Sequence, residues 1–170
     1  IGIPSVVASR VNVFNTRECD ELIQLLHAVT KPGNSGALKA VLGSEWFGLS
    51  GQEFWHVISN EQEFNRKIDC FRNYLDIWLE HGFLTMFTTL VKAEEVFVNM
   101  CSGERAERKI ANVQHLAELI QEAEQSHRYG PIQTLEWLGR MNSGQLEMEE
   151  TELRLESDSR AVKIVTMHSA

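Results

Sequence analysis

The fold is decided by the stretch Phe64-Asn65-Arg66-Lys67-Ile68-Asp69-Cys70-Phe71-Arg72-Asn73-Tyr74-Leu75-Asp76-Ile77-Trp78-Leu79. Its bulky apolar residues recur at steps of four, three, four and three: Phe64, Ile68, Phe71, Leu75 and Trp78, with Leu79 beside them. Residues with this spacing share one face of an α-helix, and such a face packs against other elements. The stretch predicts a long amphipathic helix, ended or bent by Gly82, in a mainly α, multi-helix fold.

The chain before this helix predicts three shorter helices. The first has its cap at Asn15 or Thr16 and stops at residues 31–34, where Pro and Gly do not continue a helix. Ser35 begins the second, and a turn over residues 43–50 separates it from the third. Leucines and valines at helical spacing give the first two helices apolar faces, so both are expected to contribute to the core.

The chain after it predicts further helices. Residues 83–100 form one or two, and a long helix spans roughly 104–126. The inner face of that long helix is expected to carry Ile110, Val113, Leu116, Ala117 and Ile120. Tyr129-Gly130-Pro131 is a break, and Pro131 suits the first position of the last helix because its missing N–H has no helical partner there. This last helix carries Leu135, Trp137, Leu138 and Met141.

The two ends of the chain differ from its middle. β-Branched runs predict a short strand at residues 5–8 and another at 161–170. Residues 143–160 are rich in glutamate and predict a solvated acidic linker.

Composition limits the classes of function. The 170 residues suffice for one domain with a sizeable core, and 43% hydrophobic with 24% charged residues is ordinary for a globular protein. A formal net charge of −8 argues against a broadly basic nucleic-acid-binding surface, so any DNA contact is expected to be local. Cys19, Cys70 and Cys101 are far apart, which predicts reduced thiols in a cytoplasmic protein. No apolar run is long enough to span a membrane.

Three groups of residues carry a resemblance to a known family. The chain closes on Val162-Lys163-Ile164-Val165-Thr166-Met167-His168-Ser169-Ala170, which looks like the strand and first half of motif V of superfamily 1A DNA helicases, the UvrD/Rep/RecB group. It opens on Ile1-Gly2-Ile3-Pro4, which resembles the segment after motif IV. Gly103-Glu104-Arg105, the run 112–121 and the run 153–158 resemble the β subunit of exodeoxyribonuclease V, the RecB type, in particular.

The resemblance implies a domain organisation. Residues 1–13 would be an edge of the RecA-like domain 2A, and residues 14–142 the helical 2B subdomain inserted into it. The acidic linker at 143–160 would lead to a strand and a truncated motif V of domain 2A at 161–170. The chain would then be an excised piece of a longer helicase.

The same resemblance implies an activity for the parent polypeptide. It would be an ATP-dependent DNA helicase and exonuclease with Mg, acting in double-strand-break repair with the γ and α subunits of exodeoxyribonuclease V. This chain contains no GxxxxGK[ST] phosphate loop and no paired-aspartate stretch of the Walker B type. In the family that it resembles, the nuclease lies in a separate C-terminal domain, so no nuclease residues are expected here. The piece itself is therefore predicted to have no catalytic residue, cofactor or metal, and to orient DNA and dock subunits.

Four residues are candidates for DNA contact. By resemblance, Thr166 and His168 lie along the single-strand path, where a hydroxyl and an imidazole can donate to backbone phosphates. Gly48 and Ser50 lie in a turn where related helicases bind duplex phosphates. Ser50 caps the following helix, with Glu53 as its capping-box partner. The backbone amides at the start of that helix suit an anion. The competing interpretations are a frayed C-terminus and a turn that only seats Trp46 and Phe47 in the core.

Other readings remain open at the level of sequence. Arg105, Arg108 and Lys109 form a small basic cluster. The default interpretation is that these cations pair with neighbouring glutamates. The alternative is that the cluster is a docking edge for a partner subunit or for duplex DNA. Three other functions compete with a RecB-type helicase piece. They are a helical metallo-enzyme that uses His115 and Glu118, a freestanding protein-interaction module, and the equivalent piece of an AddA- or UvrD-like helicase.

Overall fold

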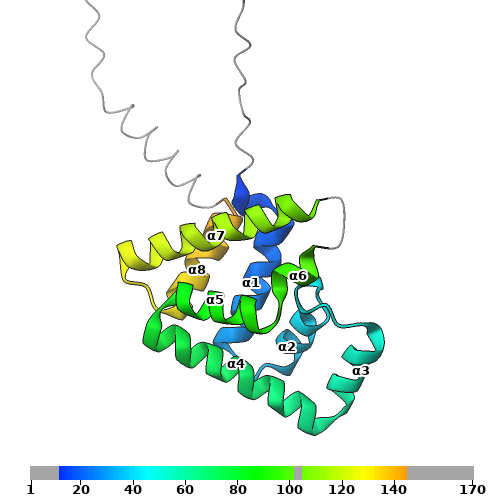
Figure 1. Cartoon of the computed structure of the whole chain (residues 1–170). Helices are drawn as coiled ribbons and strands as arrows, with labels where there is room; N and C mark the ends of the chain where they lie inside the picture. The colour runs from blue at the N-terminus through cyan, green and yellow to red at the C-terminus, as the bar shows by residue number, and fades with distance from the viewer. Residues whose placement is uncertain (1–11, 102–104, 145–170) are drawn as a thin grey trace, which may run out of the picture.

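The computed structural model describes residues 12–101 and 105–144, and this part is a bundle of eight α-helices with two short 3-10 helices (Figure 1). The mainly α prediction is confirmed. The end strands predicted at residues 5–8 and 161–170, and most of the acidic linker, lie outside the described residues. The helices are η1 (Val13–Asn15), α1 (Arg17–Thr30), α2 (Ser35–Leu42), η2 (Glu45–Phe47), α3 (Gly51–Ser59), α4 (Glu61–His81), α5 (Phe83–Ala93), α6 (Val96–Met100), α7 (Ala106–His127) and α8 (Pro131–Asn142).

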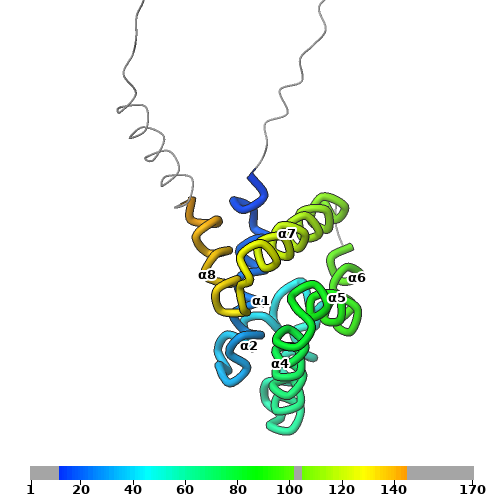
Figure 2. The backbone as a smooth tube through the Cα atoms, turned by 90° about the vertical axis from the view of Figure 1, so that its left-hand side faces the viewer, coloured from blue at the N-terminus to red at the C-terminus, as the bar shows by residue number. Residues whose placement is uncertain are grey.

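Helix α1 lies at the centre of the bundle and packs against α2, α4, α7 and α8 (Figure 2). It buries one apolar face almost completely, because Leu22, Leu26 and Val29 are each 0% exposed. Their spacing of four and three residues is the helical pattern expected from the sequence. Helices α4 and α5 pack side by side after a sharp reversal, and α3 contacts the bundle mainly through α4.

Glycine and proline set the helix boundaries largely where the sequence predicts them. Gly82 ends α4 with a φ of 84°, a backbone conformation that side chains with a Cβ rarely adopt. Pro131 occupies the first position of α8. Thr16 is the N-cap residue of α1, but its hydroxyl donates to the carbonyl of Val13 and makes no capping hydrogen bond. Asn34 caps α2, because its side-chain oxygen accepts from the amide of Ala37.

The predicted inner face of α4 needs one correction. Phe71 and Trp78 are buried, but Leu79 is 63% exposed. A residue that directly follows Trp78 lies about 100° further round the helix, which turns it away from the core. Tyr74, which the periodicity did not single out, is buried instead.

The two ends of the described helical unit lie side by side. Asn142, at the end of α8, donates from Nδ2 to the backbone carbonyl of Phe14 at 2.8 Å and to Oδ1 of Asp20 at 3.0 Å. The ring of Phe14 also packs edge-on against Trp137, with centroids 5.8 Å apart. The chain therefore enters and leaves this unit at neighbouring points.

Candidate nucleic-acid interface

The turn at Gly48 has a structural requirement of its own. Gly48 adopts a left-handed conformation with φ 61° and ψ 13° after η2. A Cβ at this position would lie 2.5 Å from Oδ1 of Asn99. The Asn99 amide is fixed there, since its Nδ2 donates to the carbonyls of Trp46 and Glu94, each at 3.0 Å. Glycine is needed at this turn whether or not a ligand binds.

Ser50 caps α3 through the predicted capping box with Glu53. Oε2 of Glu53 accepts from the Ser50 backbone N–H at 2.8 Å and from its hydroxyl at 2.6 Å, while the Glu53 amide donates to Ser50 Oγ at 3.3 Å. The hydroxyl hydrogen bond, followed by the backbone one, lowers the pKa of the Glu53 carboxyl. A phosphate at this helix start would have to compete with that carboxylate, and phosphate binding at Gly48 and Ser50 stays a prediction.

Trp46 and Phe47 belong to the core, as one interpretation of the turn expected. They are 2% and 7% exposed. The indole Nε1 of Trp46 donates to Oε2 of Glu21 at 2.9 Å, and the Phe47 ring stacks on Phe71 at a centroid distance of 5.9 Å. The turn is thereby fastened to α1 and α4.

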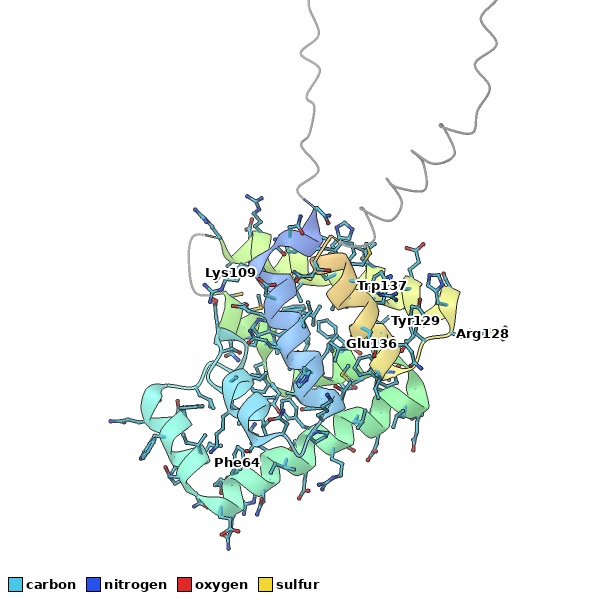
Figure 3. The ribbon with its side chains drawn as sticks, turned by 180° about the vertical axis from the view of Figure 1, so that it is seen from behind. Phe64, Lys109, Arg128, Tyr129, Glu136 and Trp137 are labelled. Carbon is cyan, nitrogen blue, oxygen red and sulfur yellow. The ribbon has the colours of Figure 1, made fainter. Side chains whose placement is uncertain are left out.

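Glu45, the acidic residue of the same turn, is paired with a lysine far along the chain. Lys109 lies on the first turn of α7 (Figure 3). Its Nζ is 2.7 Å from Oε2 and 2.8 Å from Oε1 of Glu45. Both side chains are only 28% exposed. The expected pairing within the helix is therefore wrong for Lys109, because a carboxylate brought near by folding replaces the one next to it in sequence.

The basic cluster of Arg105, Arg108 and Lys109 lies in the wall of a cleft, which we call the α1–α7 cleft. Its volume is about 350 Å³, and its lining residues are Thr16, Arg17, Glu18, Arg105, Arg108, Lys109 and Asn112. Nε of Arg17 lies 2.7 Å from Oε1 of Glu21, and that carboxylate raises the pKa of the guanidinium. Asn112 Nδ2 donates to Oε2 of Glu18 at 3.1 Å. Arg105 and Arg108 have no acidic partner within ion-pair distance among residues 12–101 and 105–144.

The second basic group on the surface, Arg66, Lys67 and Arg72 on α4, is neutralised by carboxylates, two of which lie on the same helix. On α4, Arg66 pairs with Glu63 and Arg72 with Asp69, each at 2.6 Å. Lys67 reaches Glu94, whose other oxygen accepts the hydroxyl of Tyr74 at 3.0 Å. All three cations of this group have a carboxylate partner, whereas Arg105 and Arg108 have none among the described residues.

The other predicted sites give fewer constraints. Thr166 and His168 lie outside the described residues, so their DNA contact stays a prediction. His115 and Glu118 are both exposed on α7, and within the described ranges no group of three or more His, Cys, Asp or Glu residues is placed to hold a metal ion. None of the described helices is both long and apolar enough to cross a membrane.

Comparison with known proteins gives a consistent set of relatives. No family model matches the chain. The chain is 29% identical over 176 residues to the RecBCD enzyme subunit RecB of Escherichia coli (strain K12) and 30% identical over 171 residues to that of Haemophilus influenzae, with 100% of this chain covered in both. It is 24% identical to RecB of Mycolicibacterium smegmatis over 98% of this chain. The chain spans 14% of the length of the first two relatives.

Proposed function

Because this chain belongs to the RecB family over its whole length, we propose that its helical unit is a non-catalytic subdomain that orients DNA and docks partner subunits. It would do so within a RecB-like helicase and nuclease. This assignment corresponds to a 2B-type subdomain at residues 14–142, inserted into a RecA-like motor domain.

One observation carries the proposal, namely that the two ends of the helical unit meet. The Asn142 side chain bonds to the backbone of Phe14 at 2.8 Å, which joins the last described helix to the first. A unit whose chain enters and leaves at neighbouring points can be inserted into another domain without distorting it. This geometry supports a subdomain carried between two segments of a motor.

The activity of the whole protein follows from the family and is part of the proposal. A RecB-like polypeptide would use ATP and Mg to translocate on DNA in double-strand-break repair and recombination. It would work in the cytoplasm with the γ and α subunits of exodeoxyribonuclease V. In that assembly Thr166 and His168 would donate hydrogen bonds to backbone phosphates along the single strand.

Docking and DNA orientation can be measured directly on the 170-residue chain. The chain would be titrated with a fluorescent forked duplex at low and moderate salt, and separately with the purified γ and α subunits. We expect it to bind at least one subunit, and to bind the fork in a salt-sensitive way. Binding of neither the fork nor a subunit would contradict the proposed role.

The motif V residues need the whole protein for their test. In a RecB-type protein carrying this chain, Thr166→Ala with His168→Ala is expected to lower DNA-stimulated ATP hydrolysis, since the motor loses two phosphate contacts. Thr88→Ala with His115→Ala is a matched control, because it removes the same atoms from exposed positions on α5 and α7. Equal activity of both variants would show that Thr166 and His168 do not contact the DNA backbone.

A further inference from the structure

The α1–α7 cleft combines cationic side chains, neutral hydrogen-bond donors and space for a ligand. Its volume of about 350 Å³ is far above the roughly 10–15 Å³ that a cavity needs to hold one water molecule, so a phosphate group has room there. We propose that the cleft binds a backbone phosphate of duplex DNA through Arg105 and Arg108. This deepens the proposed function, on which it rests, by naming a contact other than the Gly48 turn.

The two arginines are the groups available to a ligand. Both are exposed in the wall of the cleft. Within the described ranges neither has a carboxylate at ion-pair distance, whereas Arg66 and Arg72 on α4 are each paired at 2.6 Å. A guanidinium without a carboxylate partner can offer two parallel N–H donors to two oxygens of a phosphate.

Neighbouring groups give the cleft further donors. Lys109 has an ammonium group with three N–H donors. Both carboxylate oxygens of Glu45 accept from this group, at 2.7 and 2.8 Å. Arg17 uses Nε for Glu21 and keeps its two terminal nitrogens for other acceptors. These two cations are partly neutralised, so they would add to the field at the phosphate rather than carry its binding.

The acidic residues near the cleft limit the proposal to a local contact. Glu18 lines the cleft, and Oε2 accepts from Asn112. Glu21 and Glu45 each hold one of the cations. The cleft therefore suits a single phosphate next to Arg105 and Arg108, which agrees with the formal net charge of −8 of the chain.

The cleft lies at the end of the helical unit where its first and last described residues meet. Thr16 and Arg17 place it at the start of α1, beside residues 14 and 142. We choose a DNA phosphate as its ligand because guanidinium groups suit phosphate oxygens and because the proposed function brings duplex DNA to this unit. The Lys109–Glu45 ion pair also connects the cleft to the Gly48 turn, so both lie on adjoining surface.

Salt dependence of duplex binding tests the proposal. Binding of the 170-residue chain to a fluorescent forked duplex would be measured between 50 and 200 mM salt, for the wild type and for Arg105→Ala with Arg108→Ala. Each phosphate contact contributes about 0.9 to the slope of log K against log salt. Because the two arginines share one phosphate, the double variant is expected to have a slope shallower by about 0.9. Arg66→Ala with Arg72→Ala is the matched control, since it removes the same charge from arginines already paired on α4.

A lysine variant and a folding check complete the experiment. Arg105→Lys with Arg108→Lys is expected to keep the wild-type slope with weaker binding, because lysine retains the charge but not the two-donor fork. Thermal unfolding of each variant, followed by circular dichroism, would show that the helical unit is intact. Titration with inorganic phosphate alone separates a site for free phosphate from one that needs the duplex. A DNA site would be contradicted if the wild type bound phosphate while the alanine double variant kept the wild-type salt slope for duplex binding.

Two further outcomes would overturn the assignment. Equal slopes for the cleft variant and the α4 control, with fork binding retained, would remove the cleft from the DNA contact and leave the subdomain role standing. Loss of γ or α subunit binding by the cleft variant, with fork binding unchanged, would assign the cleft to an acidic protein partner. Failure of the proposed function is a separate result, because it requires that the wild type bind neither DNA nor a subunit.

Discussion

At Gly48 a single hydrogen atom is the only substituent that fits. The backbone is left-handed at φ 61°, and a Cβ would approach Oδ1 of Asn99 to 2.5 Å. We predict that Gly48→Ala lowers the free energy of unfolding by about 1–3 kcal/mol, measured by urea unfolding, since strain and a steric overlap add. Gly51→Ala is the control, because no atom lies within 4 Å of its Cβ position and its φ is not positive. Equal stability of the two variants would contradict this account.

That prediction affects how a DNA-binding defect at Gly48 is interpreted. A Gly48 variant that binds the fork less well can do so through a displaced Asn99 and a disturbed η2, without any lost phosphate contact. Sequence reasoning placed the glycine in a turn correctly but could not see Asn99, which is 51 positions further along the chain. A DNA role for Gly48 therefore needs a variant whose stability is unchanged.

The Ser50–Glu53 capping box predicts a pH dependence. Hydrogen bonds from Ser50 lower the pKa of Glu53 in the folded protein, so its contribution is present above the unfolded carboxyl pKa of about 4.3 and is lost as pH falls below it. We expect Glu53→Gln to lower the thermal midpoint at pH 7 and to lower it less at pH 3. Glu61→Gln, the same change at the start of α4, is the control. An equal effect of Glu53→Gln at both pH values would rule out the ionised cap.

At the scale of the elements, a carboxylate on α7 holds the reversal between α4 and α5. Glu124 accepts from Trp78 Nε1 at 2.7 Å with one oxygen and from the Phe83 amide at 2.8 Å with the other. Glutamine has one carbonyl oxygen, so Glu124→Gln leaves one donor facing an NH2 group. We predict a loss of about 1–3 kcal/mol in the free energy of unfolding, measured in urea.

The control for Glu124 lies on the same helix. Glu122→Gln makes the same chemical change at an exposed position two residues earlier and is expected to alter stability by less than about 0.5 kcal/mol. If both variants unfolded at the same urea concentration, the Glu124 hydrogen bonds would contribute nothing to the α4–α5 reversal.

Local patterns predicted the helices, whereas contacts between distant residues could not be predicted. Apolar spacing in α1, α4 and α7, together with Gly82 and Pro131, was enough to locate the helices because each signal acts within one or two turns. The Lys109–Glu45 and Glu124–Trp78 contacts join residues 64 and 46 positions apart, and no spacing rule connects them. For this reason the α1–α7 cleft could not be predicted from the sequence, although its basic cluster could.

At the scale of the whole molecule, the core makes its cysteines chemically unequal. Cys19 is 0% exposed, and burial, followed by the charge of Asp20, raises its pKa to about 11, whereas Cys70 and Cys101 are exposed. We predict that a thiol reagent at pH 8 labels two of the three cysteines rapidly and the third only on unfolding, since the thiolate is the reactive form. Cys19→Ala would remove the slow reaction. Rapid labelling of all three cysteines in the native protein would contradict the described core.

The central claim is that the helical unit serves a RecB-like motor as an inserted, non-catalytic subdomain. The most direct measurement compares two altered forms of a RecB relative, in which the segment matching residues 14–142 is replaced either by these residues or by a short Gly/Ser linker. We expect the form that carries residues 14–142 to unwind a forked duplex and to assemble with the other subunits. We expect the linker form to keep DNA-stimulated ATP hydrolysis but to lose assembly or DNA orientation. Loss of ATP hydrolysis in an otherwise folded linker form, or full unwinding and assembly without the helical unit, would contradict the central claim.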